Sequence, residues 1–375
     1  MKPHPTETGR SLDWRPKILD RYILRAYLST FFFVCIIFSL IAIAVDFSEK
    51  LDDMLEREAT WSEIIWDYYI NFVPYINGLL WPLFALISVI FFTSRLANRS
   101  EFIAMIGNGV NFYRLLVPYL VGGGILSTLL WSAGNYWIPN GNKKRVRFEN
   151  TYIWKNNFES RMDNIHMNLS TEEEIFLKNF SVVDSSGRGF TLVRYEGQKM
   201  KSKLSAVLIK PMPGQPGRWE LRNWELRTFD GLDERLQTGE RKDTAMGFLP
   251  QDFIRRDNLR ETMTSPELRR FIEEERRRGN NPAKEFEVER FRRTSEAYSI
   301  LVLTLIGVAV ASRKVRGGIG IQLFIGVALA GLYIVLTKFA ATFAIQGGLP
   351  PLLGVWVPNL FFTAIALYML YKAPK

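Results

Sequence analysis

The sequence predicts a membrane protein with six transmembrane helices, three on each side of an inserted all-β domain of jelly-roll type. The first observation is that the charged residues, 23% of the chain, are clustered and leave six long stretches without charge. The second is a polar middle region with strand-like patterns, between the third and the fourth stretch. The third is that basic residues gather at alternate ends of the stretches, as the positive-inside rule describes for multi-pass proteins.

Three uncharged runs precede the polar middle region. They are residues 26–45, 68–94 and 115–142, and each is long enough for a bilayer-crossing helix, which needs about 20 apolar residues. Pro74 and Pro82 fall in the second run. Each removes a backbone hydrogen-bond donor, so this helix is expected to kink.

Three further runs follow the middle region, at residues 297–312, 317–337 and 339–371. The first of these is short, but Arg292 and Arg293 before it and Arg313 after it can extend their charged heads to the membrane surface. Lys338 separates the last two runs. It lies either at the outer interface, with its ammonium reaching water, or within the span.

Basic residues indicate which ends of the helices face the cytoplasm. Both chain termini are therefore expected inside the cell, and the middle region outside. The basic residues lie in the N-terminal tail, in the loop after the second run and in the loop after the fourth run: Lys2, Arg10, Arg15, Lys17, Arg21 and Arg25; Arg95, Arg99 and Arg114; Arg313, Lys314 and Arg316.

The middle region alternates strand-like and turn-like segments. FTLVRYEG, KLSAVLIK and RWELRNWELRTF are rich in β-branched and aromatic residues, and DSSGRG, EGQK and PMPGQPG supply the glycines and prolines of turns. This pattern predicts an antiparallel sandwich or jelly roll. SPELRRFIEEERRRG then predicts a short charged helix with Pro266 in its first turn, and one helix from Pro282 leads into the fourth span.

The expected domains follow from these elements. Residues 1–139 hold the cytoplasmic tail, the first three transmembrane helices and a short cytoplasmic helix near 98–109. Residues 140–292 form the outer β domain with its connecting helices, and residues 293–375 form the last three transmembrane helices.

Residue types that carry catalytic chemistry are scarce. The chain has two histidines, His4 and His166, one cysteine, Cys35, and no G-x-x-x-x-G-K-[ST] phosphate loop. We therefore expect no catalytic centre, no metal site and no cofactor. The net charge of +10 could attract nucleic acid, but membrane topology accounts for the basic clusters, so the expected surroundings are membrane lipids and no nucleic acid.

Two charged segments beside the spans have a functional and a structural interpretation. Lys50, just beyond the first run, either faces a cavity or pairs with Asp46 at helical i,i+4 spacing. In RSEFIAMIGNGVNFYRLL, residues 99–116, Phe102, Met105 and Ile106 share a helix face beside Glu101. This helix either docks into a groove of another protein or lies on lipid, with Glu101 paired to Arg95 or Arg99.

Several motifs together resemble the LptF/LptG (YjgP/YjgQ) family, the permeases of the lipopolysaccharide export ABC transporter. The resemblance covers nearly the whole chain, and DRYILRAY, EKLDDML and GGLPPLLGVWVPN favour the LptG type. The motif residues are Asp20, Arg21, Tyr22 and Ile23; Arg99, Ser100, Glu101, Phe102, Ala104 and Gly107 or Gly109; Val288, Glu289, Arg292 and Arg293; and Leu349, Pro350, Trp356, Pro358 and Asn359.

The resemblance implies a permease subunit of the inner membrane of Gram-negative bacteria, acting in cell-envelope biogenesis. Such a subunit pairs with a paralogous six-span subunit, is driven by a dimer of cytoplasmic LptB-like ATPases, and passes lipopolysaccharide through its periplasmic domain to LptC/LptA-like jelly-roll proteins. It implies ATPase coupling through Arg99, Glu101, Phe102, Met105 and Ile106. Lys50 and Arg57 become candidates for binding the anionic head group.

Other functions stay open on the sequence. An integral-membrane lipid-modifying enzyme would need a catalytic constellation, and a non-transporting envelope scaffold would not need an ATPase. A four-span lipoprotein-sorting or efflux permease fits six spans poorly.

Overall fold

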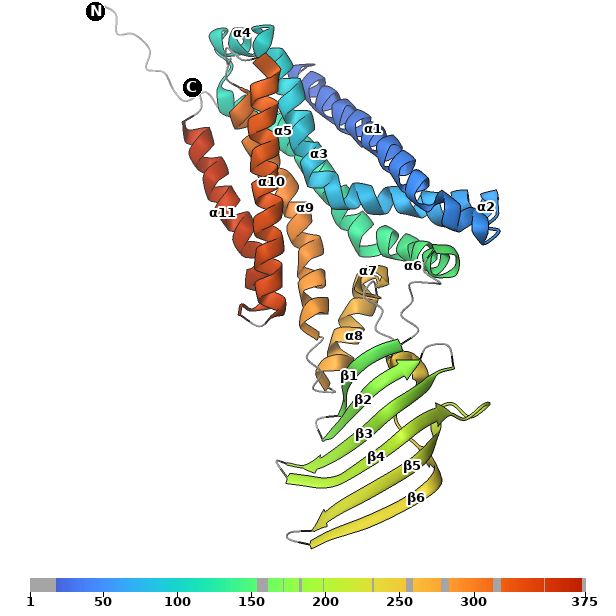
Figure 1. Ribbon diagram of the computed structural model, residues 1–375. Helices are drawn as coiled ribbons and strands as arrows, with labels where there is room; N and C mark the ends of the chain where they lie inside the picture. Colours follow the sequence, from blue (N-terminus) through green and yellow to red (C-terminus); the bar gives the residue numbers. More distant parts are fainter. Residues whose placement is uncertain are drawn as a thin grey trace, which may run out of the picture.

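The computed structural model describes residues 18–372, except 154–160, 171, 182–183, 198, 231–232, 254–258, 278–282, 313–317 and 347. A long helical bundle and a separate β-sheet domain lie end to end (Figure 1). The expectations for the N-terminal tail and for Arg313, Lys314 and Arg316 fall outside the described residues.

Six helices of the described chain are long and apolar enough to cross a membrane, which confirms the six predicted spans. The spans are made of these elements: α1 (Ile18–Glu56); α2 (Trp61–Glu63), the π-helix η1 (Ile64–Tyr69) and α3 (Ile70–Asn98); α5 (Phe112–Ser132), the π-helix η2 (Ala133–Trp137), α6 (Ile138–Phe148) and the π-helix η3 (Glu149–Ile153); α9 (Ala283–Ala311); α10 (Gly318–Ile345); and α11 (Pro351–Tyr371). The third span thus stays helical beyond residue 139, where the sequence analysis placed a domain boundary.

The second and third spans both bend near the sheet domain. Pro74 and Pro82 lie inside α3, and Figure 1 shows α3 running across the bundle near α2 before it turns along the bundle axis. The two bent segments pack closely because Gly78 has no side chain: a Cβ there would lie 2.6 Å from Cδ1 of Ile138. α6 therefore crosses the bundle together with the start of α3 (Figure 1).

A short helix, α4 (Glu101–Gly107), joins α3 to α5 at the end of the bundle farthest from the sheet (Figure 1). We call this end of the bundle the α4 end and the opposite one the sheet end. A helix within the predicted segment 98–109 is thereby confirmed.

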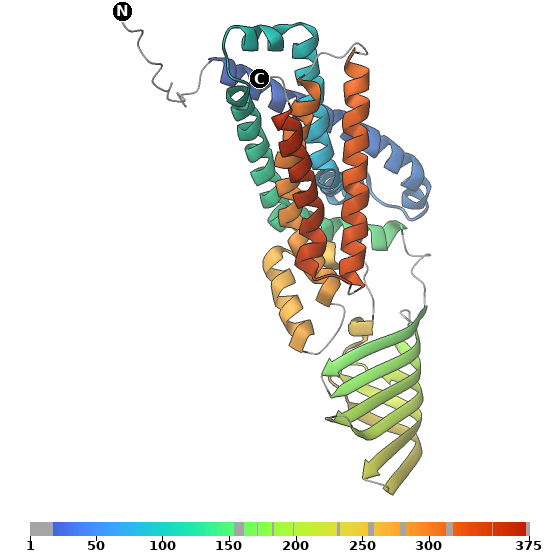
Figure 2. The ribbon, with the colours of Figure 1, turned by 90° about the vertical axis from the view of Figure 1, so that its left-hand side faces the viewer.

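The sheet domain has six strands in one antiparallel sheet, β1 to β6 in sequential order. The inserted all-β domain is confirmed, but its described strands form a curved meander (Figure 2), whereas a standard jelly roll has eight strands in two sheets. The strands are β1 (Arg161–Ser170), β2 (Glu173–Ser181), β3 (Ser186–Glu196), β4 (Lys199–Pro211), β5 (Arg218–Asp230) and β6 (Asp233–Ala245).

One face of the sheet is covered by the segment that leaves β6. Phe248 and Phe253, the latter in the 3₁₀ helix η5 (Pro250–Phe253), pack on Trp219 with ring centroids 5.0 and 5.9 Å away. The chain then returns to the bundle through α7 (Leu259–Thr262) and α8 (Ser265–Arg277), the predicted charged helix.

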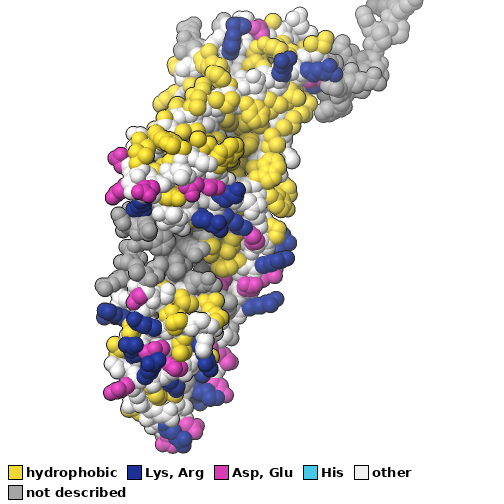
Figure 3. All heavy atoms as spheres, turned by 90° about the vertical axis from the view of Figure 1, so that its right-hand side faces the viewer, with side chains coloured by type: hydrophobic (Ala, Val, Ile, Leu, Met, Phe, Trp, Pro, Cys, Tyr) yellow, Lys and Arg dark blue, Asp and Glu magenta, His cyan; other side chains and the backbone are white. Residues whose placement is uncertain are grey.

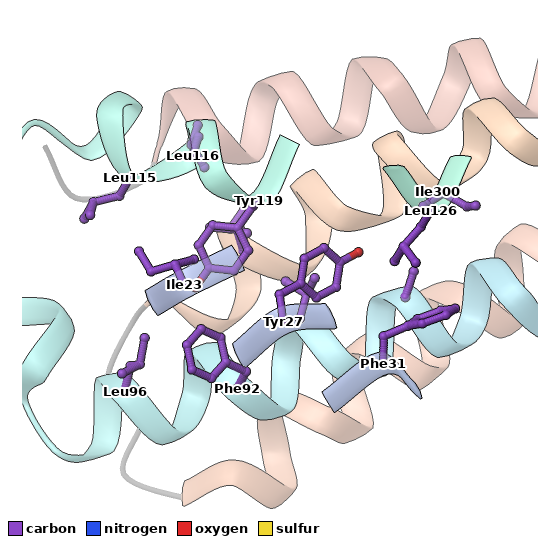
Figure 4. Packing of buried hydrophobic residues seen from close by; sticks show 14 of the residues in the cluster. Ile23, Tyr27, Phe31, Phe92, Leu96, Leu115, Leu116, Tyr119, Leu126 and Ile300 are labelled. Atoms are coloured by element: carbon purple, nitrogen blue, oxygen red, sulfur yellow. The ribbon is translucent and has the colours of Figure 1, made fainter. Parts of the chain in front are cut away.

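The bundle core at the α4 end joins α1, α3 and α5. Figure 4 shows Tyr27 of α1 beside Tyr119 of α5 and Phe92 of α3. The Tyr27 hydroxyl shares a 3.0 Å hydrogen bond with Thr304 of α9. Only 11% of the apolar window of α1 is buried, compared with 67% for α9, so α9 is central and α1 is peripheral.

Gly122 of α5 allows the close contact with α1, and its replacement by alanine is expected to destabilise the bundle. A Cβ there would lie 2.6 Å from Cδ1 of Tyr27 and 3.1 Å from Cδ1 of Leu24, and such overpacking costs about 1–3 kcal/mol. Thermal unfolding of the detergent-solubilised protein measures the effect.

Gly124 provides the matched control on the same helix. A Cβ there meets nothing within 4 Å, so Gly124→Ala should be neutral or stabilising, by up to about 1 kcal/mol of helix propensity. Equal stability of the two alanine variants would show that α1 does not pack tightly on Gly122.

Candidate functional site

A cavity of about 340 Å³ lies at the sheet end of the bundle. Its walls come from α3, from the third span, from α9 and α10, and from the connecting helix α7, so it sits where the membrane helices meet the path to the sheet. The residues that line it are Tyr75, Gly78, Leu79, Leu130, Gly134, Ile138, Pro139, Asn142, Arg260, Glu261, Glu285, Val288, Glu289, Arg292, Arg293, Glu296, Lys338, Ala341, Thr342 and Ile345.

Four of the charged α9 residues that line this cavity bond to one another. Arg292 donates from Nε to Oε2 of Glu289 at 2.8 Å and from Nη1 to Glu296, while Arg293 donates from Nε to Oε1 of Glu289 at 3.1 Å. The spacings i,i+3 and i,i+4 place all four on neighbouring turns. Two guanidinium groups and two carboxylates therefore compensate one another, as buried charges require.

Arg293 also holds the connection between the sheet and the bundle. Its side chain is 4% exposed, and it donates to the carbonyls of Arg260 at 3.2 Å and Met263 at 2.9 Å and to Oγ of Ser265 at 3.2 Å. The Ser265 hydroxyl in turn donates to Oδ1 of Asn135 in η2. Arg293 thus joins the fourth span, the third span and the chain returning from the sheet.

A second contact fastens α8 to α6. Nζ of Lys143 donates to both carboxylate oxygens of Glu267, at 2.8 and 2.9 Å. This hydrogen bond keeps the pKa of the Glu267 carboxyl below its ordinary value. The sheet end of the third span is therefore tied to the connecting helices at two points.

Lys338 of α10 lines the same cavity. Its side chain is exposed, and within the described part of the chain no hydrogen bond or ion pair holds its ammonium, although Glu296 is close enough to interact with its charge. Lys338 thus belongs to α10 and borders the cavity, while its depth in the membrane stays a prediction.

Lys50 lies in a polar cluster outside the cavity lining. Its Nζ donates to Oδ1 of Asp46 at 2.6 Å and to the Tyr68 hydroxyl at 2.5 Å, and Oε1 of Glu149 is 3.8 Å away. Glu149 also accepts a 2.7 Å hydrogen bond from Arg145. Of the two interpretations of Lys50, the structure therefore supports the ion pair with Asp46.

Arg57 follows α1 and lies outside the cavity lining as well. Its Nη1 is buried, and no hydrogen-bond acceptor for it is found among the described residues. No ion pair between Arg57 and Asp53 is found among the described residues either.

The apolar residues of α4 face the chain itself. Phe102 is fully buried and packs edge-on against Phe112 of α5 at a centroid distance of 6.3 Å, and Met105 and Ile106 pack against the same core. The structure therefore removes Phe102 from the predicted docking face, because α4 folds back onto α3 and α5, whereas Met105 and Ile106 are only partly buried. Among the described side chains of α4, the exposed positions are Ala104 and Gly107, with Glu101 at the edge.

Arg99 and Glu101 remain accessible at the α4 end. Their charged groups are 3.8 Å apart, and their side chains are 59% and 37% exposed. Ser100 does not cap α4 with its side chain and instead adopts a left-handed conformation, with φ of 61°. Of the two possible partners of Glu101, the structure selects Arg99.

Asn359, a residue of the predicted C-terminal motif, had no assigned role. Its amide donates to the Ser295 carbonyl at 3.1 Å, and its carbonyl accepts from the Tyr333 hydroxyl at 3.0 Å. It thereby joins α9, α10 and α11. An asparagine inside an otherwise apolar run is the sequence signal that could have identified it, since polar groups in spans bond across helices.

One protein-family model matches nearly the whole chain. The model described as "Lipopolysaccharide export system permease LptF/LptG" matches residues 21–372, and none of the curated proteins compared with the chain matches it. The match confirms the resemblance seen in the motifs, while the preference for the LptG type stays a prediction. Because the match covers nearly the whole chain, this protein belongs to the LptF/LptG family of lipopolysaccharide export permeases.

Proposed function

We propose that this permease pairs with a second six-span subunit of the same family, and that a separate ATPase drives extraction of lipopolysaccharide from the inner membrane. The observation that carries the proposal is the cavity at the sheet end, which combines apolar helix walls with the exposed ammonium of Lys338. A glycolipid with anionic phosphates and apolar acyl chains needs both features in one place.

The α4 end faces the cytoplasm in this proposal, and the sheet domain lies in the periplasm. Arg95, Arg99 and Arg114 lie at the α4 end, and acidic residues such as Glu49 and Asp52 lie at the far end of α1. This distribution supports the orientation through the positive-inside rule. Figure 3 shows hydrophobic side chains over the bundle and charged ones where it approaches the sheet.

Lys338 is the first candidate to bind a phosphate of the glycolipid, because its ammonium is exposed at the cavity. Arg292 is held by Glu289 and Glu296, and Lys50 is held by Asp46. A phosphate would have to displace a carboxylate from either of them. Arg57, whose buried Nη1 has no acceptor among the described residues, is the second candidate, outside the cavity lining.

The sheet domain passes the lipid to LptC/LptA-like jelly-roll proteins in this proposal. β1 and β6 are the two edges of the described sheet, each paired on one side only. An edge strand offers free backbone groups to which a strand of another protein can add. Along β6 every residue is at least partly exposed and most are fully exposed, which supports β6 as the contact.

The ATPase contacts the permease at α4 in this proposal. Ala104, Gly107 and the Arg99–Glu101 pair form the accessible surface there, while Phe102, Met105 and Ile106 support α4 from beneath. Small residues allow close approach of another protein, and the charged pair provides directed hydrogen bonds.

Depletion of the protein in its own bacterium tests the proposed function. Newly made lipopolysaccharide, followed by pulse labelling and membrane fractionation, is expected to accumulate in the inner membrane. Restoration by a plasmid copy serves as the control. Normal arrival of labelled lipopolysaccharide at the outer membrane, with no paralogue compensating for the depleted subunit, would overturn the proposal.

A further inference from the structure

A partly buried ion pair joins the first transmembrane helix to the helix that follows α4. Asp20 lies in the first turn of α1 and Arg114 in the first turn of α5. Nη1 of Arg114 donates to Oδ1 of Asp20 at 2.8 Å, and Nη2 donates to Oδ2 at 2.5 Å. The side chains are only 17% and 14% exposed, and this two-point geometry fixes the orientation of both groups.

α4 and the first turn of α5 form one compact corner. Phe102 of α4 packs on Phe112 of α5, and Asn111 caps α5 by accepting from the backbone N–H of Tyr113 at 2.8 Å. Val110, between the two helices, bonds through its N–H to the carbonyl of Met105 at 3.2 Å. A displacement of α4 therefore also displaces Arg114, two residues beyond Phe112.

Farther along, α1 has other attachments to the bundle: Tyr27 shares a hydrogen bond with Thr304, Ser39 accepts from Asn77, and Asp46 and Lys50 bond to Tyr68. Its buried residues are Ile23, Tyr27 and Phe31 near the α4 end, and Ser39 and Met54 farther along. Its apolar window is the least buried of the six spans. A displacement of the α4 corner would therefore reach α1 first at the start of this helix. Asp20 is the residue there that forms an ion pair with the corner, through Arg114.

We propose that the Asp20–Arg114 pair is a positioning strap, which transmits displacement of α4 to α1. The proposal rests on the proposed function in one respect, namely that the ATPase acts on α4. The bidentate, charge-assisted pair resists separation, because moving the two side chains apart breaks two hydrogen bonds at once. The strap therefore makes the α4 corner and the start of α1 move together.

Charge reversal of the two residues tests the strap in the native complex, purified through a tagged copy of this chain. Asp20→Arg and Arg114→Asp each place like charges together, and the double variant restores an opposite-charge pair. Three quantities are measured: the amount of assembled complex, its ATP hydrolysis, and the lipopolysaccharide delivered to the cell surface. Asp20→Asn, which is nearly isosteric, serves if a reversed variant does not assemble.

The single variants are expected to keep assembly and ATP hydrolysis, while lipopolysaccharide delivered per ATP falls at least about fivefold, the lower end of typical coupling energies. The double variant is expected to recover most of this ratio. A merely structural pair would lower the amount of complex and leave the ratio unchanged. That outcome, or a double variant no better than the singles, would overturn the strap.

Glu101→Arg separates failure of the strap from failure of the proposed function. Its side chain is accessible at the α4 end, so it should weaken association with the ATPase whether or not the strap exists. Glu101→Arg could lose association with the ATPase while the charge-reversal variants deliver the normal amount of lipopolysaccharide per ATP. That result would reject the strap and leave the proposed function standing. Normal association and export in Glu101→Arg would reject contact of the ATPase with α4.

Discussion

Replacement of Arg293 by methionine is expected to lower the free energy of unfolding by about 3 kcal/mol, because removing one member of a buried charge network leaves its partners uncompensated. The carbonyls of Arg260 and Met263 would lose their donor, and so would Oγ of Ser265. The loss stays at the lower end of the expected range because Arg292 still neutralises Glu289. Thermal unfolding in detergent measures the loss of stability. Amide hydrogen exchange of α7 measures how far the connecting segment loosens.

Arg194→Met is the matched control for Arg293→Met. Nε of Arg194 donates to Oε1 of Glu173 at 2.8 Å on the sheet surface, with side chains 58% and 32% exposed. Exposed ion pairs contribute at most about 1 kcal/mol. Equal destabilisation by the two substitutions, or unchanged protection of α7 in Arg293→Met, would show that Arg293 does not hold the connecting segment.

Reversal of the charge at Lys338 is expected to give the largest loss of substrate affinity. A hydrogen bond to a charged group contributes about 1.5–3 kcal/mol, so Lys338→Glu should weaken lipopolysaccharide binding by roughly tenfold to a hundredfold or more. Lys338→Arg keeps the positive charge and should bind nearly normally. Equilibrium binding of lipopolysaccharide to the purified native complex measures the difference.

Two comparisons make the Lys338 measurement specific. Lys144→Glu changes an exposed lysine of α6 outside the cavity lining, and it should leave affinity unchanged. Dephosphorylated lipid should bind Lys338→Glu and the unaltered protein about equally, because no anion is left to contact Lys338. If Lys338→Glu binds intact lipopolysaccharide normally, Lys338 does not contact the phosphates.

The sequence predicted the elements well because the bilayer imposes a length requirement that any local window can reveal. An apolar run of about 20 residues is sufficient evidence for a span, and all six were confirmed. The strands and the charged helix α8 were recognisable for a similar reason, since turn residues and periodicity are local. The meander order of the sheet was not, because the pairing of strands is decided by contacts between segments.

Candidate site residues were harder to predict from the sequence because each depends on partners far along the chain. Phe102 had the spacing of a docking face, but the fold of α4 onto Phe112 buries it. Lys50 had the charge for a ligand, but Tyr68 and Glu149 from two other spans close around it together with Asp46. Helical periodicity shows which residues share a face, and it does not show what that face meets.

The sequence by itself determined the membrane spans, the inserted sheet domain and the family, because hydropathy, turn chemistry and motifs are properties of short segments. Only the tertiary structure decided that Lys338 borders a cavity, that Arg293 holds the returning chain, and that Asp20 binds Arg114. The physical reason is that a charged side chain takes its role from the groups that compensate it. In this protein several of those groups come from distant helices.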